Sequence, residues 1–153
     1  MRARKNGCKL NKIVVGGVAL IFAVTVSACS EDGDAGMFPI ELADSRVEAG
    51  EIIYADNCVS CYGPANGPSV LESVPVHGDT GHTWHHPDRL LFQWILDRPP
   101  LAVTMPAFRD KLSEAEVIDI LAYIKSHWLP EIQDHHAAGS AQYENQIIEF
   151  GME

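Results

Sequence analysis

Residues 58–63 read Cys-Val-Ser-Cys-Tyr-Gly, and the interpretation of the whole chain depends on this stretch. Two cysteines separated by two residues form a C-x-x-C pair, which occurs in redox proteins, in zinc sites and at sites of cofactor attachment. The residues before the pair follow a helical period, and one face of that predicted helix holds Val47, Gly50, Ile53 and Tyr54. A C-x-x-C pair that follows a helix argues against a thioredoxin-type oxidoreductase, where the pair lies near a strand.

Helical patterns separated by loops continue beyond the pair. The first helix is expected to begin near Asp44 or Ser45, either of which can cap it. Residues 63–86 are rich in proline and glycine and predict a long loop. A second helix follows, with Pro87 suited to its first position and Pro99-Pro100 as its stop. Its apolar face is formed by Leu90, Leu91, Trp94 and Ile95.

A third helix opens with a capping-box pattern, Ser113-Glu114-Ala115-Glu116. Apolar residues then recur at steps of three and four, and Pro130 is expected to end the helix. These residues are Val117, Ile120, Leu121, Ile124 and Trp128. Since no alternating strand pattern of useful length appears, the predicted class is all-α, with a domain over residues 44–130. Residues 131–153 are expected to form a C-terminal tail that could include a short helix.

The start of the chain has the features of an export signal. A basic segment is followed by an apolar run, residues 13–26, that is too short for a stable membrane span. Val26-Ser27-Ala28-Cys29 then resembles a bacterial lipobox, which implies cleavage of a signal peptide, residues 1–28, and lipidation of Cys29. An uncleaved anchor, or a signal cut by ordinary signal peptidase, is the alternative. Residues 29–43 are expected to form an acidic tether between the lipid and the domain.

The charge limits the classes of partner. Residues 1–28 hold five basic residues and no acidic ones, so their removal changes the formal net charge from −10 to −15. So acidic a chain is not expected to bind nucleic acid, and anionic lipid head groups should repel it. A redox partner with a basic docking face is the electrostatic expectation, although solubility alone also explains much of the charge. We expect a location in the cell envelope, exported and lipid-anchored, facing the periplasm or the cell exterior.

The order of these features resembles the class I c-type cytochromes over roughly residues 44–130. The matching features are Cys58, Cys61, Gly63, Gly67, Met105-Pro106 and the segment 121–124. The resemblance implies a cytochrome c-like fold of three to four helices around a haem. It also implies haem c, with its iron, bound through thioether bonds to Cys58 and Cys61. A domain this small often needs a covalently held cofactor or cross-link for stability, because it buries proportionally little surface.

The resemblance also implies two ligands for the haem iron. In the family a histidine follows the second cysteine and lies under the iron, but this chain has Tyr62 there. Met105 matches the methionine that binds the opposite, distal face. A thioether ligand favours ferrous iron and raises the reduction potential. Ordinary core filling is the alternative role of Met105.

Three outcomes are open for Tyr62. Tyrosinate can bind ferric haem, but the phenol must first lose a proton from a group whose ordinary pKa is about 10. Alternatively, Tyr62 packs beside the haem and leaves the iron to Met105, water or a substitute histidine. Finally, haem is not attached at all, because attachment commonly requires the histidine.

A histidine cluster precedes the second predicted helix. Residues 81–88 read Gly-His-Thr-Trp-His-His-Pro-Asp, with His77 just upstream. His82, His85 or His86 could bind the haem iron or a separate metal, because imidazole suits zinc, copper and iron. The alternative is a structural role, in which a histidine beside Pro87 caps the helix. His135 and His136 are expected to be exposed to solvent.

Three functions are consistent with this sequence. The first is a lipid-anchored, monohaem electron carrier that passes single electrons between respiratory or exported redox partners. Such a protein is not itself an enzyme and has no catalytic residue, apart from a weak peroxidase activity that an open iron would allow. The second is a haem protein whose open iron site binds a small ligand or peroxide. The third is a haem-free lipoprotein that binds a soft metal through Cys58, Cys61 and two of the loop histidines.

Overall fold

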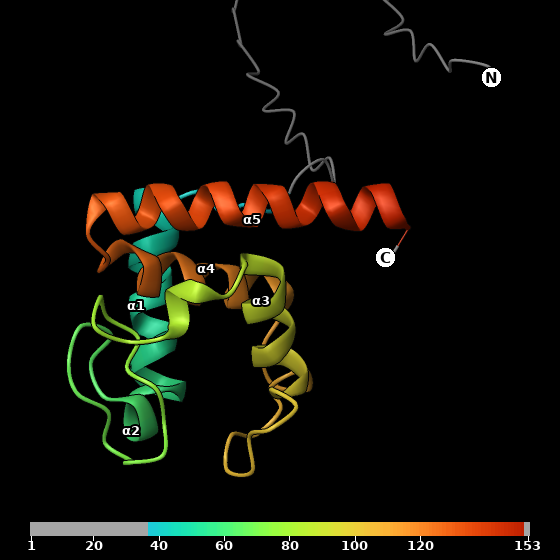
Figure 1. Ribbon diagram of the computed structural model, residues 1–153. Coiled ribbons are helices and arrows are strands. Elements are labelled where there is room, and N and C mark those ends of the chain that lie inside the picture. Colours follow the sequence, from blue (N-terminus) through green and yellow to red (C-terminus); the bar gives the residue numbers. More distant parts are fainter. Residues whose placement is uncertain (1–36, 152–153) are drawn as a thin grey trace, which may run out of the picture. The chain divides into compact units, whose positions relative to one another are not determined.

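The computed structural model describes residues 37–151, which form five α-helices and one short 3₁₀ helix and contain no strand (Figure 1). The elements are α1 Asp44–Asn57, α2 Val59–Tyr62, η1 Thr83–His85, α3 Asp88–Asp97, α4 Glu114–Ser126 and α5 Pro130–Phe150. The all-α prediction is confirmed, with five helices in place of three to four. Within these residues no helix is both long and apolar enough to cross a membrane. The predicted signal peptide, Cys29 and most of the tether lie outside the described residues.

The core is built on the close crossing of α1 and α4. A Cβ atom at Gly50 of α1 would lie 1.9 Å from the carbonyl oxygen of Asp119 and 2.9 Å from Cβ of Tyr123, both in α4. Only glycine therefore allows the two backbones to approach this closely. Tyr54, one turn further along α1, is buried and packs its ring 5.3 Å from that of Tyr123. The crossing fixes the direction in which α1 leads into the C-x-x-C pair.

The helix boundaries correct three local predictions. Ala43, which has no capping side chain, occupies the N-cap of α1, so Asp44 is a helical residue rather than the cap. Pro87 is the N-cap of α3 rather than its first residue. Pro130 does not end α4, which already ends at Ser126. It is instead the first residue of α5. The capping box of α4 is confirmed, since Ser113 and Glu116 bond to each other's backbone amides.

The folded part extends beyond residues 44–130 at both ends. Phe38 and Ile40, assigned by the sequence to the tether, are buried in the core. Residues 130–150, assigned to a tail with at most a short helix, form the 21-residue α5, which runs across one end of the other helices (Figure 1). α5 buries His136, Ser140 and Ile147. His135 is exposed as expected, but His136 is not, because it points inward and bonds to the backbone carbonyl of His86 at 2.9 Å.

A buried ion pair joins these added segments to the rest of the fold. Lys125 of α4 donates from Nζ to both carboxylate oxygens of Asp88, at 2.9 and 2.8 Å, and to the carbonyl of Ile40 at 3.1 Å. The amide of Ile40 donates to Asp88 at 2.8 Å, and the amide of Asp88 donates to Ser140 of α5 at 3.0 Å. Burial lowers the pKa of Lys125, and the neighbouring Asp88 opposes that shift. One network therefore ties the N-terminal segment, α3, α4 and α5 together.

Candidate cofactor site

The C-x-x-C pair lies in a single helical turn whose end is fixed by glycine. α2 ends at Gly63, which has a φ of 68° and would bring any Cβ within 2.4 Å of the Pro68 carbonyl oxygen. Tyr54 donates its hydroxyl to the carbonyl of Gly63 at 2.9 Å. The amides of Val70 and Leu71 both donate to the carbonyl of Cys61 at 3.1 Å. The long loop is thus folded back onto the pair, whose cysteines are free and partly buried.

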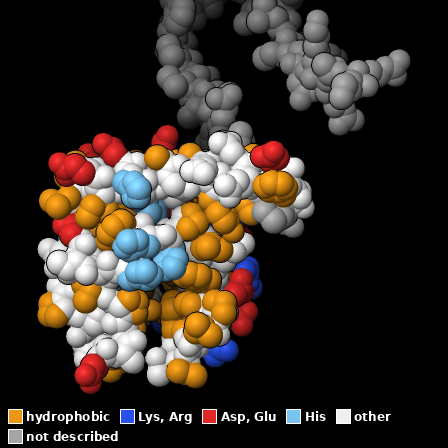
Figure 2. All heavy atoms as spheres, in the orientation of Figure 1, with side chains coloured by type: hydrophobic (Ala, Val, Ile, Leu, Met, Phe, Trp, Pro, Cys, Tyr) orange, Lys and Arg blue, Asp and Glu red, His pale blue; other side chains and the backbone are white. Residues whose placement is uncertain are grey.

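The two cysteines line a mostly apolar cavity of about 490 Å³. Its walls come from α2, the loop before η1, α3, the loop after α3, and α4. The apolar walls include Leu91, Trp94, Phe108, Leu112, Ile120 and Leu121. Figure 2 shows a groove on this face of the molecule, bordered by hydrophobic side chains, with histidine side chains gathered at its upper end. A volume and lining of this kind suit a large, flat, apolar ligand.

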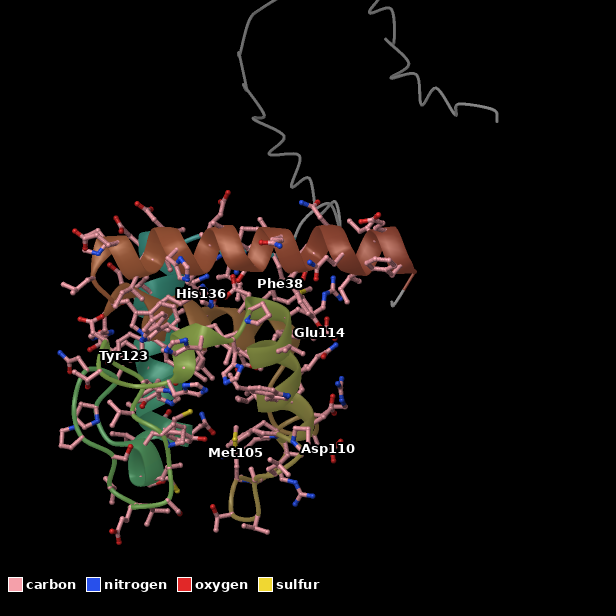
Figure 3. The ribbon with its side chains drawn as sticks, in the orientation of Figure 1. Phe38, Met105, Asp110, Glu114, Tyr123 and His136 are labelled. Carbon is pink, nitrogen blue, oxygen red and sulfur yellow. The ribbon has the colours of Figure 1, made fainter. Side chains whose placement is uncertain are left out.

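Met105 lies in the loop that joins α3 to α4 and lines the cavity. The loop returns to the fold where the amide of Phe108 donates to the carbonyls of Ile95 and Leu96 at 3.2 and 3.0 Å. Figure 3 shows Met105 projecting from this loop toward the part of the chain that carries α2. There Tyr62 donates its hydroxyl to the Met105 sulfur at 3.1 Å. The structure therefore brings together the two positions at which the sequence predicted the iron ligands.

Burial keeps Cys58 and Tyr62 protonated at neutral pH. Burial, with smaller effects of Cys58 and Cys61, raises the pKa of Tyr62 to about 12. Burial, with a further contribution of Cys61, raises the pKa of Cys58 to about 11. At neutral pH the Tyr62 side chain is a neutral phenol, which is a far weaker ligand for ferric iron than tyrosinate.

The loop histidines divide into two groups around the cavity. His77 lines its wall, and its ring stacks on that of Tyr62 with centroids 4.4 Å apart. His82 and His86 also line the cavity, whereas His85 does not and stacks on Trp84 at 3.7 Å. Burial, together with His82 and His85, lowers the pKa of His86. Within residues 37–151, no three histidine, cysteine, aspartate or glutamate side chains come close enough together to hold a metal ion.

Of these histidines, His77 was the weakest candidate ligand in the sequence, although its ring lies beside Tyr62, at the predicted proximal position. The sequence shows it only as an isolated histidine in a Pro/Gly-rich loop, and the path of that loop depends on contacts with distant residues. One such contact is the hydrogen bond of 2.6 Å that the indole nitrogen of Trp128 donates to the carbonyl of His77.

Comparison with known families agrees with this geometry. Residues 45–124, more than half of the chain, match the family model described as cytochrome C oxidase, cbb3-type, subunit III. The chain belongs to this family of c-type cytochrome domains. No characterised protein and no solved structure gave a significant match. Domains of this family are haem-based electron-transfer modules rather than enzymes by themselves, and their cofactor is covalently bound haem c with its iron.

The cavity of this cytochrome domain fits a haem in volume, in apolar lining and in the two cysteines on its wall. The contact between Tyr62 and Met105 does not fit an iron atom between them. Metal–oxygen and metal–sulfur bonds of about 2.0–2.3 Å each would require more than about 4 Å between the two ligand atoms. The Tyr62 hydroxyl lies only 3.1 Å from the Met105 sulfur, so this pair must separate when haem is present.

Proposed function

We propose that the chain is a lipid-anchored, monohaem c-type cytochrome that carries single electrons between exported redox partners. Cys58 and Cys61 hold the haem by thioether bonds, and Met105 is the distal ligand of its iron. The observation that carries this proposal is the apolar cavity, because it has the C-x-x-C pair on one wall and Met105 across from it.

The chemistry follows from the character of these residues. A haem bound in the cavity supplies a metal that changes its charge by one electron. The apolar walls contributed by α3 and α4 exclude water, so that the change in charge requires little reorganisation of the surroundings. The Met105 thioether is soft and neutral, and it favours the ferrous state.

The surroundings of the cavity suit transient docking. Leu101 and Val103 line the cavity and are 96% and 93% exposed, so they offer an apolar contact beside the cofactor. A net charge of −15 after loss of residues 1–28 would attract and orient a partner with a basic face. Lipidation of Cys29 would confine the cytochrome to the membrane surface on the periplasmic or exterior side.

The test is export of the full chain in a strain with haem-attachment machinery, beside a Tyr62→His variant. We expect the intact mass of the wild-type chain to include one covalent haem, and its absorption spectrum to show reversible reduction. If only Tyr62→His carries haem, the wild-type chain keeps the fold without the cofactor, and electron transfer is excluded as its function. Labelling of the exported chain with a lipid precursor, with Cys29→Ala as the matched control, tests the anchor separately.

A second function is favoured by the chemistry of Tyr62. The neutral phenol is a poor ligand, and an iron held only by Met105 would keep an open position for a small ligand or peroxide. A high-spin ferric spectrum and rapid binding of cyanide would support this alternative. A low-spin, six-coordinate iron would exclude it.

A further inference from the structure

We propose that His77 supplies the imidazole ligand of the haem iron in place of the histidine that is missing from position 62. This inference deepens the proposed function and requires a haem in the cavity. It does not require that the haem be covalently attached.

The first argument is position. The His77 ring lies nearly parallel to the Tyr62 ring, with centroids 4.4 Å apart and an interplanar angle of 19°. Tyr62 occupies the place from which the proximal ligand of a c-type cytochrome approaches the iron. His77 therefore lies on the same side of the cavity, about one ring thickness from that place, and displacement of the Tyr62 ring would leave that place to His77.

The second argument is the tautomer of the ring. Nδ1 of His77 lies 2.9 Å from the Thr83 hydroxyl, which has the Val76 carbonyl as its own acceptor at 3.4 Å. With that hydroxyl donated to Val76, Nδ1 is the protonated nitrogen and Nε2 carries the free lone pair. No hydrogen bond to Nε2 is present among residues 37–151. Histidines that bind metals characteristically donate the other ring N–H to a neighbouring acceptor in this way.

The third argument is that the backbone of His77 is held in place. Its carbonyl accepts a hydrogen bond of 2.6 Å from the indole of Trp128, which is buried just beyond the end of α4. Two residues further, the Asp79 carboxylate accepts from the amide of Leu129 at 2.9 Å. The loop is thus fastened to the segment between α4 and α5 at His77 itself and two residues beyond it. Burial lowers the pKa of His77 to about 4, so its imidazole is neutral at physiological pH.

The other candidate ligands are less well placed. The His86 ring packs edge-on against Trp94 at 4.6 Å and against His82 at 4.9 Å, which fixes it at the edge of the cavity. His82 is exposed to solvent, and His85 does not line the cavity. Of the cavity histidines, only His77 stacks on the residue that fills the proximal position. Displacement of Tyr62 would also break its hydrogen bond to Met105 and free that sulfur for the opposite face.

The test uses haemin added to the purified full chain in which Cys58 and Cys61 are both replaced by alanine. This background removes the thiols as ligands and makes the result independent of covalent attachment. We expect a low-spin ferric spectrum with the near-infrared charge-transfer band of methionine-ligated haem. Adding His77→Ala should abolish both features and weaken haemin binding at least about tenfold. Free imidazole should restore the low-spin spectrum in that variant, which would show that the cavity is still intact.

Matched variants decide the outcome. His127→Ala removes a histidine outside the cavity and should leave the spectrum unchanged. His82→Ala and His86→Ala test the competing ligands. The proposal is overturned if the background fails to bind haemin, if His77→Ala keeps the low-spin spectrum, or if one of the competing variants loses it instead. Absence of covalent haem from the exported wild-type chain would remove the proposed function, whereas the haemin result would still decide the role of His77.

Discussion

The Tyr62 hydroxyl donates a hydrogen bond to the Met105 sulfur across the cavity, over 3.1 Å. The contact leaves no room for an iron atom between these two side chains, so an iron atom in that position and this hydrogen bond exclude each other on grounds of distance. Under the proposed function, Met105 would exchange this hydrogen bond for the haem iron, so its substitution should affect mainly the haem-loaded protein.

Substitution of Met105 by leucine tests its role as a ligand. In haem-loaded protein, Met105→Leu should remove the near-infrared charge-transfer band and lower the reduction potential by on the order of 0.1 V, because axial ligands set haem potentials over a range of about 0.8 V. Potentiometric titration followed by absorbance gives the measurement. Met37→Leu, which changes a methionine that does not line the cavity, is the control. Equal potentials for the two variants would count against Met105 as a ligand.

The crossing of α1 and α4 predicts that Gly50 cannot be replaced. Gly50→Ala would place a Cβ 1.9 Å from the Asp119 carbonyl oxygen, so the helices must separate, and we expect a loss of at least about 2 kcal/mol in the free energy of unfolding. Gly139 in α5 has no atom within 4 Å of an added Cβ, so Gly139→Ala should stabilise the helix by up to about 1 kcal/mol. Urea unfolding followed by circular dichroism measures both. Similar effects of the two substitutions would contradict the close crossing.

Because the Lys125–Asp88 pair is buried, removing one charge should lower the free energy of unfolding more than removing both charges. Lys125→Met leaves the Asp88 carboxylate buried without its cation and should cost about 3–5 kcal/mol. Adding Asp88→Asn to that variant removes the uncompensated charge and should recover much of the loss. A double-mutant cycle in urea gives the coupling, with the exposed Lys111→Met as the control. Additive losses from the two substitutions would show that the pair is not coupled.

The haem-free protein should lose stability in mild acid through His77. Because burial lowers the pKa of His77 from 6.5 to about 4, the unfolded chain binds more protons than the folded one between these pH values. The free energy of unfolding should therefore fall as the pH drops from about 6.5 to about 4, by up to about 3 kcal/mol.

Burial also lowers the pKa of His86 and His136, so part of this acid dependence belongs to them. His77→Asn should remove only the part of the acid dependence that His77 contributes. Unfolding free energies at a series of pH values provide the comparison. An acid dependence that is the same with and without His77 would contradict the effect of burial on its ring.

The parts of the fold that the sequence predicted well are those set by local interactions. The capping box at Ser113 and the apolar residues that follow it define α4, because side chains three and four residues apart share one face of a helix. Glycines and prolines likewise predict the long loop after Gly63. The boundary errors at Asp44 and Pro87 amount to one residue each, because the observed N-caps, Ala43 and Pro87, make no side-chain capping hydrogen bond that the sequence could reveal.

The parts that could not be predicted depend on partners distant in the sequence. α5 buries His136 and Ser140, two polar residues with no apolar periodicity to reveal them, and they contact the carbonyl of His86 and the amide of Asp88. Phe38 and Ile40 read as part of an acidic tether because their buried neighbours lie in α3 and α4. The place of His77 follows from its bond to Trp128, 51 residues away.

The ion pair of Asp88 and Lys125 lies apart from the cofactor cavity. Neither residue lines the cavity, and neither does Gly50 at the helix crossing. The interactions that join the N-terminal segment to α3, α4 and α5 are therefore made by side chains that a cofactor in the cavity would not touch. Substitution of Asp88, Lys125 or Gly50 therefore leaves every side chain of the cavity lining in place.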